Sequence, residues 1–426
     1  MSARRAVVIG GGAVGVCTSW YFARRGWKVT LLDRGQVGEG CSFGNAGLVV
    51  PSHSIPLAAP GVWQQGLRWM LRQDAPFRLR TRADLDLARW LWMFVRSCTD
   101  AHVERALPLL RALSFASLRL WRELAALPGF DFGFQQGGML MAYRTQAAFA
   151  AAAREAERLR SHGVAAEVLD PPATVRLEPC LRGAIAGSVC FPDDAQLVPE
   201  RFVKGLARRA VGEGVDVVTS AEVLGFERSN GRLRAARTTA GAFDGDEFVL
   251  AAGASSHALA RRLGLRLPVQ GGKGYSVTFA SSSWRPRCPL MLGEDRLAIT
   301  PMGDRLRISG TLELGARDLS VDRRRALVLL NAAGRWLEGV PTVPEGTDVW
   351  AGLRPCTPDG LPFVGRTRTV DNLTVATGHA MLGVSLAPIT GWLVSQLVSG
   401  DESEISLDGL SPDRFERDPH PARRTA

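Results

Sequence analysis

The chain has 426 residues, a hydrophobic fraction of 46% and a formal net charge of +10. This length allows two or three domains with their own cores and the composition is that of a soluble globular protein, while no apolar run reaches the roughly 18 residues that span a bilayer. The basic residues are scattered instead of forming the stripe with interleaved aromatics that binds nucleic acid, although the positive charge suits an anionic membrane surface or an acidic partner.

The numbers and spacings of cysteine and histidine argue against disulfide bonds and against a bound metal. Seven cysteines, an odd number without a CxxC pair, predict free thiols. Six histidines without metal-ligand spacing predict a protein without a bound metal. The first predicted strand begins within ten residues of Met1, which leaves no room for a signal peptide and predicts a cytoplasmic location.

Residues 6–33 predict a strand, a tight turn, a helix and a second strand, which together make one βαβ unit. In the turn, Gly10 permits the bend, Gly12 lets a pyrophosphate approach the backbone, and Gly15 lets the helix sit close to the strand. Asp33 ends the second strand, where its carboxylate can accept the hydroxyls of an adenosine ribose. The unit predicts binding of an ADP-containing dinucleotide, which can be NAD or FAD.

The remaining elements follow in chain order from periodicity and turn residues. They are a loop at 41–52, a Trp- and Arg-rich, mostly helical region at 62–126 interrupted at 76–82, a strand at 137–143, a helix at 147–163, a strand, loop and helix at 186–214, a strand, meander and strand at 215–254, short strands at 268–315, a helix at 323–339, and a Pro/Gly-rich loop, two strands and a helix at 351–400. The charged tail from Ser411 is expected to be poorly ordered.

This order predicts an α/β plus α+β fold, in which a mixed-sheet domain is inserted in two pieces into a discontinuous dinucleotide-binding domain. The dinucleotide-binding domain is expected at 1–50, 197–265 and 348–410, the substrate domain at 51–196 and 266–347, and the tail at 411–426. The sequence shows no internal repeat that would divide the chain further.

Motifs spread over nearly the whole chain extend the argument. They are GGGAVG (10–15) with Asp33, CSFGNAGLVVPS (41–52), PLAAPG (56–61), PVQGGKGYSVTF (268–279), ISGTLELG (308–315), GLRPCTPDGLPFVG (352–365) and ATGHAMLGVSLAPITG (376–391). In this order they resemble the D-amino-acid oxidase superfamily of FAD-dependent amine dehydrogenases and oxidases, and most closely the bacterial D-amino-acid dehydrogenase family. The resemblance implies a Rossmann-like, glutathione-reductase-like domain that binds FAD.

The physical character of two glycine-rich segments agrees with a flavin. The loop 44–47 has little side-chain bulk, as is needed where backbone lies against a flat ring, and the turn 378–385 would direct N–H groups and a helix dipole at the flavin edge. For each glycine alone, an ordinary turn or cap is the alternative. The cofactor contacts implied are Gly10, Gly12, Ala13, Val14, Gly15, Asp33, Arg34, Ser42, Asn45, Ala46, Gly47, Val223, Ala252, Gly253, Gly378, His379, Gly383, Val384 and Ser385.

The resemblance also implies the reaction: a D-amino acid with a small or apolar side chain loses a hydride from Cα to the flavin N5, and the imino acid is hydrolysed to a 2-oxo acid and ammonia. If the amine is bound neutral, the protein must mainly position the substrate and anchor its carboxylate. Arg354 matches the family's carboxylate-binding arginine, whose fork suits a carboxylate; a surface arginine is the alternative. Tyr275 matches a tyrosine placed over the substrate, with a core aromatic as its alternative.

Four other polar side chains near these motifs are interpreted as structural. Lys273 is expected to be a solvated turn lysine and Glu313 to belong to a structural salt bridge, with a place at the cleft as the alternative for each. His53 and His379 flank flavin-contacting loops and are expected to be neutral and packed.

The chain departs from the wider superfamily at two motif positions. Met381 replaces an arginine of glycine-oxidase-like members, so a second carboxylate anchor is absent and the pocket is more apolar there. Gly352 stands where sarcosine-oxidase-like members attach FAD to a cysteine, so we expect non-covalent FAD, with Cys356 a buried thiol.

The resemblance implies that electrons pass to a quinone or respiratory acceptor, often at the inner face of the plasma membrane. Segment 62–82, with Trp63, Trp69 and several arginines, is a candidate membrane-docking surface, and ordinary helix packing is the alternative. For the whole chain, the alternatives are a D-proline, hydroxyproline, sarcosine or glycine-type dehydrogenase or oxidase, a flavin-binding subunit of a multi-component complex, and a non-catalytic nucleotide sensor.

Overall fold

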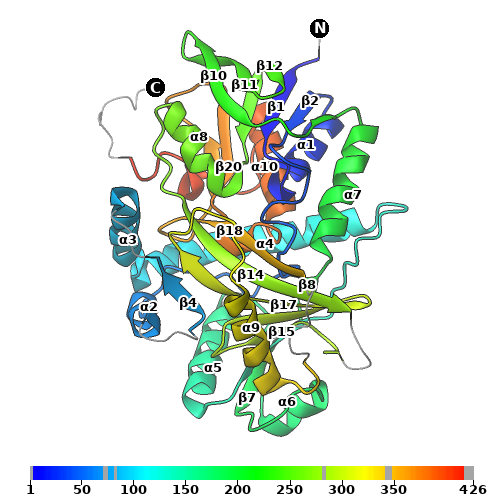
Figure 1. Ribbon diagram of the computed structural model, residues 1–426, viewed down its shortest axis with the longest axis vertical. Helices are drawn as coiled ribbons and strands as arrows, with labels where there is room; N and C mark the ends of the chain where they lie inside the picture. The colour runs from blue at the N-terminus through cyan, green and yellow to red at the C-terminus, as the bar shows by residue number, and fades with distance from the viewer. Residues whose placement is uncertain (1–2, 71–74, 81–83, 281–284, 341–347, 417–426) are drawn as a thin grey trace.

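The structure is a computed structural model that describes residues 3–70, 75–80, 84–280, 285–340 and 348–416. Besides two small sheets, its described strands form a six-stranded sheet in the upper half of Figure 1 and a nine-stranded sheet in the lower half. Residues from widely separated parts of the sequence contribute to each sheet, as a discontinuous domain organisation requires.

The six-stranded sheet has the order β19-β20-β13-β1-β2-β9. Its strands are β1 (Arg5–Ile9), β2 (Lys28–Leu32), β9 (Asp216–Val218), β13 (Glu247–Leu250), β19 (Phe363–Arg366) and β20 (Leu373–Thr377). All neighbours pair in parallel except β19, which runs antiparallel to β20. After its first residue β1 is apolar throughout, because layers cover both faces of this sheet. The predicted Rossmann-like fold with its βαβ unit is confirmed.

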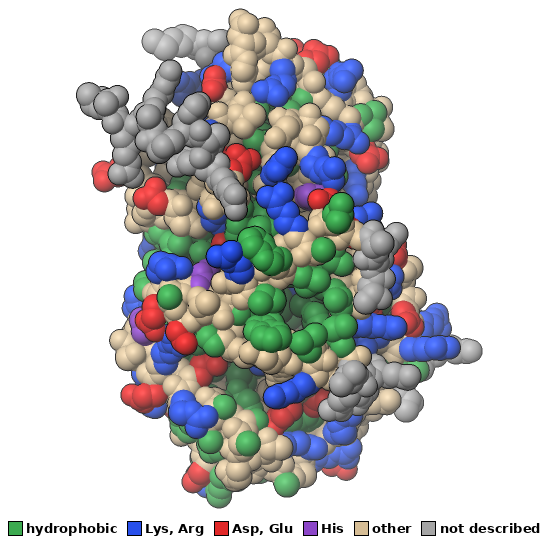
Figure 2. Space-filling model, turned by 90° about the vertical axis from the view of Figure 1, so that its left-hand side faces the viewer, with side chains coloured by type: hydrophobic (Ala, Val, Ile, Leu, Met, Phe, Trp, Pro, Cys, Tyr) green, Lys and Arg blue, Asp and Glu red, His purple; other side chains and the backbone are tan. Residues whose placement is uncertain are grey.

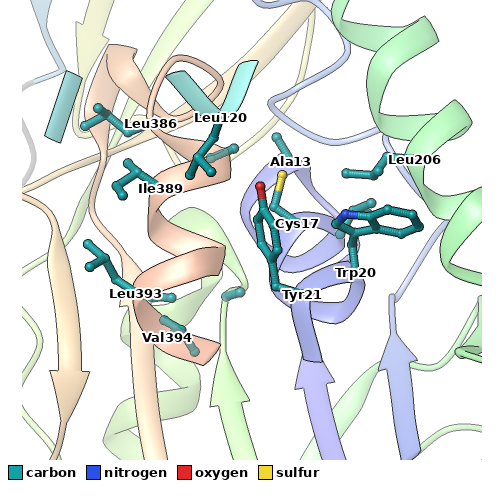
Figure 3. Packing of buried hydrophobic residues seen from close by; sticks show 14 of the residues in the cluster. Ala13, Cys17, Trp20, Tyr21, Leu120, Leu206, Leu386, Ile389, Leu393 and Val394 are labelled. Atoms are coloured by element: carbon teal, nitrogen blue, oxygen red, sulfur yellow. The ribbon is translucent and has the colours of Figure 1, made fainter. Parts of the chain in front are cut away.

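One face of this sheet is covered by helices that share a hydrophobic core. They are α1 (Ala13–Arg24), α4 (Asp100–Ala125), α7 (Pro199–Gly212) and α10 (Ala387–Ser399). Figure 3 shows Tyr21 of α1 on the side of α10, and Trp20 near Leu206 of α7. The two outer segments of the chain meet closely because Gly391 has no side chain: a Cβ there would lie 2.6 Å from the carbonyl carbon of Cys17.

The opposite face is covered by a meander and a short helix. These are β10 (Val223–Ser229), β11 (Arg232–Thr238), β12 (Gly241–Asp244) and α8 (Ser256–Arg262). The turn between β10 and β11 has positive φ at both Asn230 and Gly231, as this dipeptide predicts. Side chains of β1 alternate between the two cores, so that Val7 packs under the meander and Val8 under the helices.

The nine-stranded sheet is mixed and has the order β18-β14-β17-β16-β15-β5-β7-β6, with β4 paired to β17. Its strands are β4 (Phe77–Leu79), β5 (Met139–Tyr143), β6 (Glu167–Leu169), β7 (Gly187–Phe191), β14 (Gln270–Ala280), β15 (Leu290–Leu292), β16 (Leu297–Met302), β17 (Arg305–Leu314) and β18 (Asp348–Cys356). The other elements near it are α5 (Gln146–Ser161), α6 (Pro171–Leu177), α9 (Arg323–Trp336) and the two-stranded sheet β3 (Leu48–Val49) with β8 (Ala195–Gln196).

Alternate residues of the larger sheet reach opposite faces. Val277 and Ile308 enter a core under α9, whereas Arg307 reaches the loop that follows β2, where it binds the carbonyls of Phe43 and Asn45. We call this second face the pocket face. Its residues, strand by strand, are Trp350, Gly352, Arg354, Cys356, Gly272, Gly274, Ser276, Thr278, Arg307, Ser309, Ala298, Thr300, Met291, Met139 and Met141.

Three parts of the chain differ from the expectation drawn from the sequence. Residues 348–356, expected within the dinucleotide-binding domain, form β18 of the larger sheet, because the glycines of β14 leave room for its side chains. Helix α4 packs in the core of the six-stranded sheet, although it lies in the range assigned to the substrate domain. Residues 411–416 are packed instead of loose, because Arg414 binds both carboxylate oxygens of Asp359 at 2.7 and 2.9 Å. The rest of the tail lies outside the described residues.

Candidate active site

The turn after β1 leaves no room for side chains. A Cβ on Gly10, whose φ is 113°, would lie 2.5 Å from the carbonyl oxygen of Ala251, and a Cβ on Gly15 would overlap the carbonyl oxygen of Gly10. The turn therefore lies against the end of β13, where Ala252 and Gly253 follow. This close packing brings the predicted Gly10–Gly15 and 252–253 segments together, as a pyrophosphate site at the ends of parallel strands requires.

The N-terminus of α1 is open to an anion. The helix begins after Gly12 without a side-chain cap, and its first turn holds no acidic residue. The N–H of Ala13 donates to the Ser42 hydroxyl at 3.0 Å, which brings the loop 41–47 to the helix start. Besides Ala13, the first turn supplies the N–H of Val14 and the positive end of the helix dipole, which together favour a phosphate.

Asp33 closes the same turn from the end of β2. Its two carboxylate oxygens accept the N–H groups of Gly11 at 2.6 Å and Gly35 at 2.8 Å. An ionised carboxylate has further lone pairs, so Asp33 can still accept ribose hydroxyls. Its own carbonyl accepts from the N–H of Ala221 at 2.8 Å, and this bond places Val223, at the start of β10, near the expected adenosine site.

The C-terminal segment 378–385 lies at the other end of the site. Gly378 has a φ of 82° and follows β20. The hydroxyl of Ser385, just before α10, accepts from the N–H of Val50 at 3.1 Å. His379 Nε2 lies 2.9 Å from the Thr390 hydroxyl, and burial lowers the pKa of His379 to about 4. The imidazole is therefore neutral and packed, as expected.

A buried arginine ties the loop 41–47, which we call the cofactor loop, to the pocket face. Arg307, which is 2% exposed, donates from Nη1 to the carbonyl oxygens of Phe43 at 2.9 Å and Asn45 at 2.8 Å. Its Nη2 lies 3.3 Å from a carboxylate oxygen of Glu200, which balances the charge. The Asn45 side chain in turn accepts the N–H of Gly47 at 2.8 Å. The loop predicted to lie against the flavin is thus held by specific bonds.

Arg354 lies on the pocket face beside a β-bulge. Its guanidinium rests against the backbone of Gly274, where a Cβ would overlap it. Nη1 donates to the carbonyl oxygen of Thr311 at 2.8 Å. Thr311 has a φ of 59° and stands where the register of β17 shifts opposite Gly274, so the bulge aims this carbonyl at the arginine. In the described part of the chain no carboxylate pairs with the half-buried Arg354.

Two further side chains of β18 flank this arginine. The ring of Trp350 lies across Gly352 and against Gly44, since a Cβ on either glycine would overlap the ring. The thiol of Cys356 lies against Gly272, where a Cβ would be 2.8 Å from Sγ. Burial raises the pKa of Cys356 to about 12 despite the nearby guanidinium. The buried thiol therefore stays protonated, which makes it a poor nucleophile.

Hydroxyl groups on the pocket face lack protein partners. The side-chain oxygens of Ser276, Thr300 and Ser309 are buried, and none forms a hydrogen bond within residues 3–416 as far as they are described. A Cβ on Gly44 would lie 2.8 Å from Oγ of Ser276, so this hydroxyl faces the cofactor loop. A buried, unpaired hydroxyl costs about 1–3 kcal/mol. These hydroxyls are therefore available to bond a polar ligand.

Tyr275 lies on the opposite face from Arg354. Its ring is 1% exposed and packs in the core under α9. Burial raises the pKa of its hydroxyl, and the nearby Glu313 raises it further. The structure therefore does not bring Tyr275 and Arg354 together, and the alternative of a core aromatic describes the tyrosine.

The two charged residues interpreted as structural have different outcomes. Glu313 is 1% exposed and lies 3.1 Å from Nε of the buried Arg325, so it belongs to a structural ion pair as expected. The expectation for Lys273 was wrong, because its side chain is fully buried and Nζ lies 3.0 Å from a carboxylate oxygen of Asp318. A buried lysine needs an opposite charge, and Asp318, in the loop that follows β17, supplies the carboxylate.

The predicted cofactor residues form a connected set, except that Arg34 is exposed at its margin. The hydroxyl of Thr377 donates to the carbonyl of Gly253 at 3.0 Å and so links the 252–253 and 378–385 segments, which include the buried Val384. Sequence reasoning missed the loop-holding Arg307, and it missed Trp350. Only the alternation along β17 and β18 could have placed them on the pocket face, and that requires knowing which face is the pocket.

Comparison with known proteins gives matches over nearly the whole chain. The family model described as FAD dependent oxidoreductase matches residues 5–397. A D-amino acid dehydrogenase of Paramagnetospirillum magneticum is 35% identical over 424 residues, covering 96% of this chain and 99% of that protein. Another of Cereibacter sphaeroides is 36% identical over 417 residues, covering 96% and 95%.

Solved structures share the fold. Glycine oxidase from Geobacillus kaustophilus has a TM-score of 0.78 at 24% identity, covering 97% of this chain and 99% of that chain. L-proline dehydrogenase from P. horikoshii has a TM-score of 0.72 at 20% identity, covering 97% and 98%.

The site fits the group that such a family uses. The turn at Gly10–Gly15 leaves the backbone bare for a pyrophosphate, and Asp33 keeps lone pairs for a ribose. The loop 44–47 lies beside the unpaired hydroxyl of Ser276, which a polar ring can bond. Family model, relatives and site agree that the chain belongs to the family of FAD-dependent oxidoreductases and uses FAD as its cofactor.

Proposed function

We propose that this flavoenzyme oxidises D-amino acids and that Arg354 binds their carboxylate. The observation that carries the proposal is a half-buried guanidinium on the pocket face that no carboxylate of the described chain neutralises. An arginine fork binds a carboxylate through two parallel hydrogen bonds. Relatives that match the chain nearly end to end are named D-amino acid dehydrogenases, which supports this substrate class.

The remainder of the pocket face favours a small or apolar side chain. Met139 and Ala298 are buried there, and Met141 and Ile55 pack against the same hydrophobic cluster. Met381 is 48% exposed and supplies no second cation. The cluster offers a substrate side chain apolar contacts.

The proposed mechanism is one of positioning. When bound, FAD accepts the hydride that the substrate carbon gives up. We assign the pyrophosphate to Gly10–Gly15, the ribose to Asp33, and the flavin to segments 42–47 and 378–385, all held without a covalent bond. The bond from Arg354 to the Thr311 carbonyl fixes the guanidinium before substrate arrives, so little ordering is needed on binding.

Anaerobic addition of D-alanine or D-valine is expected to bleach the visible flavin absorbance of the purified holoenzyme. The matching L-amino acids should leave the absorbance unchanged, because the mirror-image Cα–H would point away from the ring when the carboxylate is held. D-Proline, sarcosine and glycine in the same panel test the other amine substrates. Bleaching by L-amino acids alone would contradict the proposal, and hydrogen peroxide formed in air would identify an oxidase.

We further propose that electrons leave to a quinone at an anionic membrane surface. Helices α2 (Val62–Met70) and α3 (Leu85–Ser97) lie together at one side of the molecule, and Figure 2 shows a hydrophobic, hollowed surface there with blue side chains around it. Its exposed apolar side chains are Trp63, Leu67, Met70, Leu85, Trp92 and Val95, and its exposed basic side chains are Arg68, Arg78, Arg89 and Arg96. In the described residues, no helix combines the length and apolar character needed to cross a bilayer.

The double variant Trp63→Ser/Trp92→Ser is expected to weaken binding to anionic phospholipid vesicles by about tenfold or more, since each apolar side chain contributes on the order of 1.5 kcal/mol when buried. Vesicle co-sedimentation measures this. Val211→Ser/Leu224→Ser is the matched control, because both side chains are 53% exposed and lie elsewhere. Equal binding by the two double variants would contradict the docking surface.

A further inference from the structure

Three polar side chains form a buried chain next to the cofactor loop. The hydroxyl of Ser52 lies 2.6 Å from Asp194 Oδ2 and 2.9 Å from His53 Nδ1. The N–H of Ser52 also donates to Asp194 Oδ1 at 3.1 Å. Asp194 is 1% exposed and Ser52 is 6% exposed. The positioning mechanism described above uses none of the three.

The hydrogen bonds determine where the protons lie. An ionised carboxylate can only accept, so the Ser52 hydroxyl donates to Asp194. The Ser52 oxygen then accepts the Nδ1–H of His53, which leaves Nε2 of the neutral imidazole as an acceptor. Burial and, to a smaller extent, the nearby positive Arg296 lower the pKa of His53 to about 4. At neutral pH the imidazole is therefore uncharged, and Nε2 keeps a lone pair that can accept a proton.

His53 lies at the junction of the cofactor site and the pocket face. Its N–H donates to the carbonyl of Val50 at 3.0 Å, and the N–H of Val50 binds the hydroxyl of Ser385 at the start of α10. Ile55, two residues further on, packs in the same cluster as Ala298 of the pocket face. The side chain of His53 keeps partial exposure although the groups around it desolvate it, as expected for the wall of an interior site.

The environment of Asp194 raises the pKa of its carboxyl group toward neutral pH. Burial, the largest effect, raises its pKa to about 7, although the two hydrogen bonds from Ser52 oppose the rise; the neighbouring Asp193 adds to it. Burial and the charges of Glu167 and Asp194 raise the pKa of the Cys190 thiol to about 11. Within the described residues no cation pairs with Asp194. At neutral pH this carboxyl group can both take up and release a proton.

We propose that Nε2 of His53 accepts the proton of the substrate ammonium group and that Ser52 and Asp194 position His53 and take up that proton. The inference rests on the proposed function, because an amino acid arrives with a charged amine that has no lone pair to form an imine. As the ammonium N–H bond breaks, its proton binds Nε2, the Nδ1 proton moves to the Ser52 oxygen, and the Ser52 proton moves to Asp194. The amine becomes neutral, the carboxylate becomes neutral, and no electrons leave the substrate in this step.

The test measures the anaerobic rate of flavin reduction against pH, with the D-amino acid that reduces the wild type fastest. His53→Asn is expected to lower the rate at pH 7 by about 10² or more, and Ser52→Ala and Asp194→Asn by about tenfold, as for loss of general base catalysis. Above the pKa of the substrate amine, all three variants should approach the wild-type rate, because the substrate then arrives neutral. Ser54→Ala is the matched control: this buried hydroxyl binds the carbonyl of Pro51 and lies outside the chain of three.

The dependence on pH separates proton transfer from a structural role. A loss of equal size at every pH, or a Ser54→Ala variant that follows Ser52→Ala, would overturn the relay. Unchanged rates in Ser52→Ala, which removes one oxygen, would overturn it as well. If only L-amino acids or secondary amines reduce the wild type, the proposed substrate class fails, and the same pH comparison with that amine still decides the relay.

Discussion

Replacing Arg354 with alanine is expected to raise the KM for a D-amino acid by about 10- to 150-fold, since a hydrogen bond to a charged group contributes about 1.5–3 kcal/mol. The half-buried guanidinium is held by the Thr311 carbonyl and carries no carboxylate partner in the described chain. Removing it leaves a substrate carboxylate without its counter-charge. The dependence of the anaerobic flavin-reduction rate on substrate concentration measures the effect directly.

Two further variants separate the arginine's charge from its geometry. Arg354→Lys keeps the charge but loses the planar fork, so we expect a KM between those of the wild type and the alanine variant. Gly274→Ala retains the arginine itself, but the added Cβ would occupy the position of the guanidinium. This variant should therefore also raise KM. An unchanged KM in Arg354→Ala would refute the carboxylate site, and a normal KM in Gly274→Ala alone would show that the arginine can move aside.

Motif residues and their environments were predictable from the sequence to different degrees. The glycines of the first turn and Asp33 could be read directly, because a local βαβ unit determines their geometry. Tyr275 matched a motif just as well, yet β14 turns it into the core under α9. A strand pattern of period 2 states which residues share a face, but not which face meets the cofactor.

The role of Arg307 is the clearest example of what the sequence could not predict. The chain has 52 basic residues, nearly all arginine, and nothing local distinguishes the one that holds the loop 41–47. Its role arises from tertiary packing, since β17 reaches the carbonyls of Phe43 and Asn45 from more than 260 residues away. The bulge at Thr311 is equally hidden, because a threonine at positive φ has no sequence signal.

The placement of two elements could not be predicted for a related reason. The sequence places α4 and β18 by their neighbours along the chain, but hydrophobic packing assigns α4 to the core with Val16 and Leu393, and hydrogen bonding assigns β18 to β14. The packed residues 411–416 were unpredictable because Arg414 acts through a distant aspartate, Asp359. Element types were predicted well, whereas pairing between distant elements needed the structure.

Replacing Gly15 with alanine is expected to lower FAD affinity by about 10² and to reduce thermal stability, because overpacking of this kind costs up to about 3 kcal/mol. The added Cβ would overlap the carbonyl oxygen of Gly10 and lie 3.1 Å from its carbonyl carbon, so α1 must move away from β1. Moving the helix start takes the first-turn N–H groups away from the pyrophosphate. The flavin-to-protein absorbance ratio after gel filtration and the melting temperature measure the two effects.

Gly334→Ala supplies the matched control, since Gly334 also lies within a helix and a Cβ there would meet nothing within 4 Å. Alanine favours a helix over glycine by about 0.5–1 kcal/mol, so this variant should melt slightly higher with full FAD content. Comparing the two variants separates the effect of the close approach between α1 and β1 from the effect of helix propensity. If Gly15→Ala retained FAD like Gly334→Ala, the glycine would be an ordinary helix residue. The cofactor's affinity would then have to come from Asp33 and the far segment 378–385 instead of the turn.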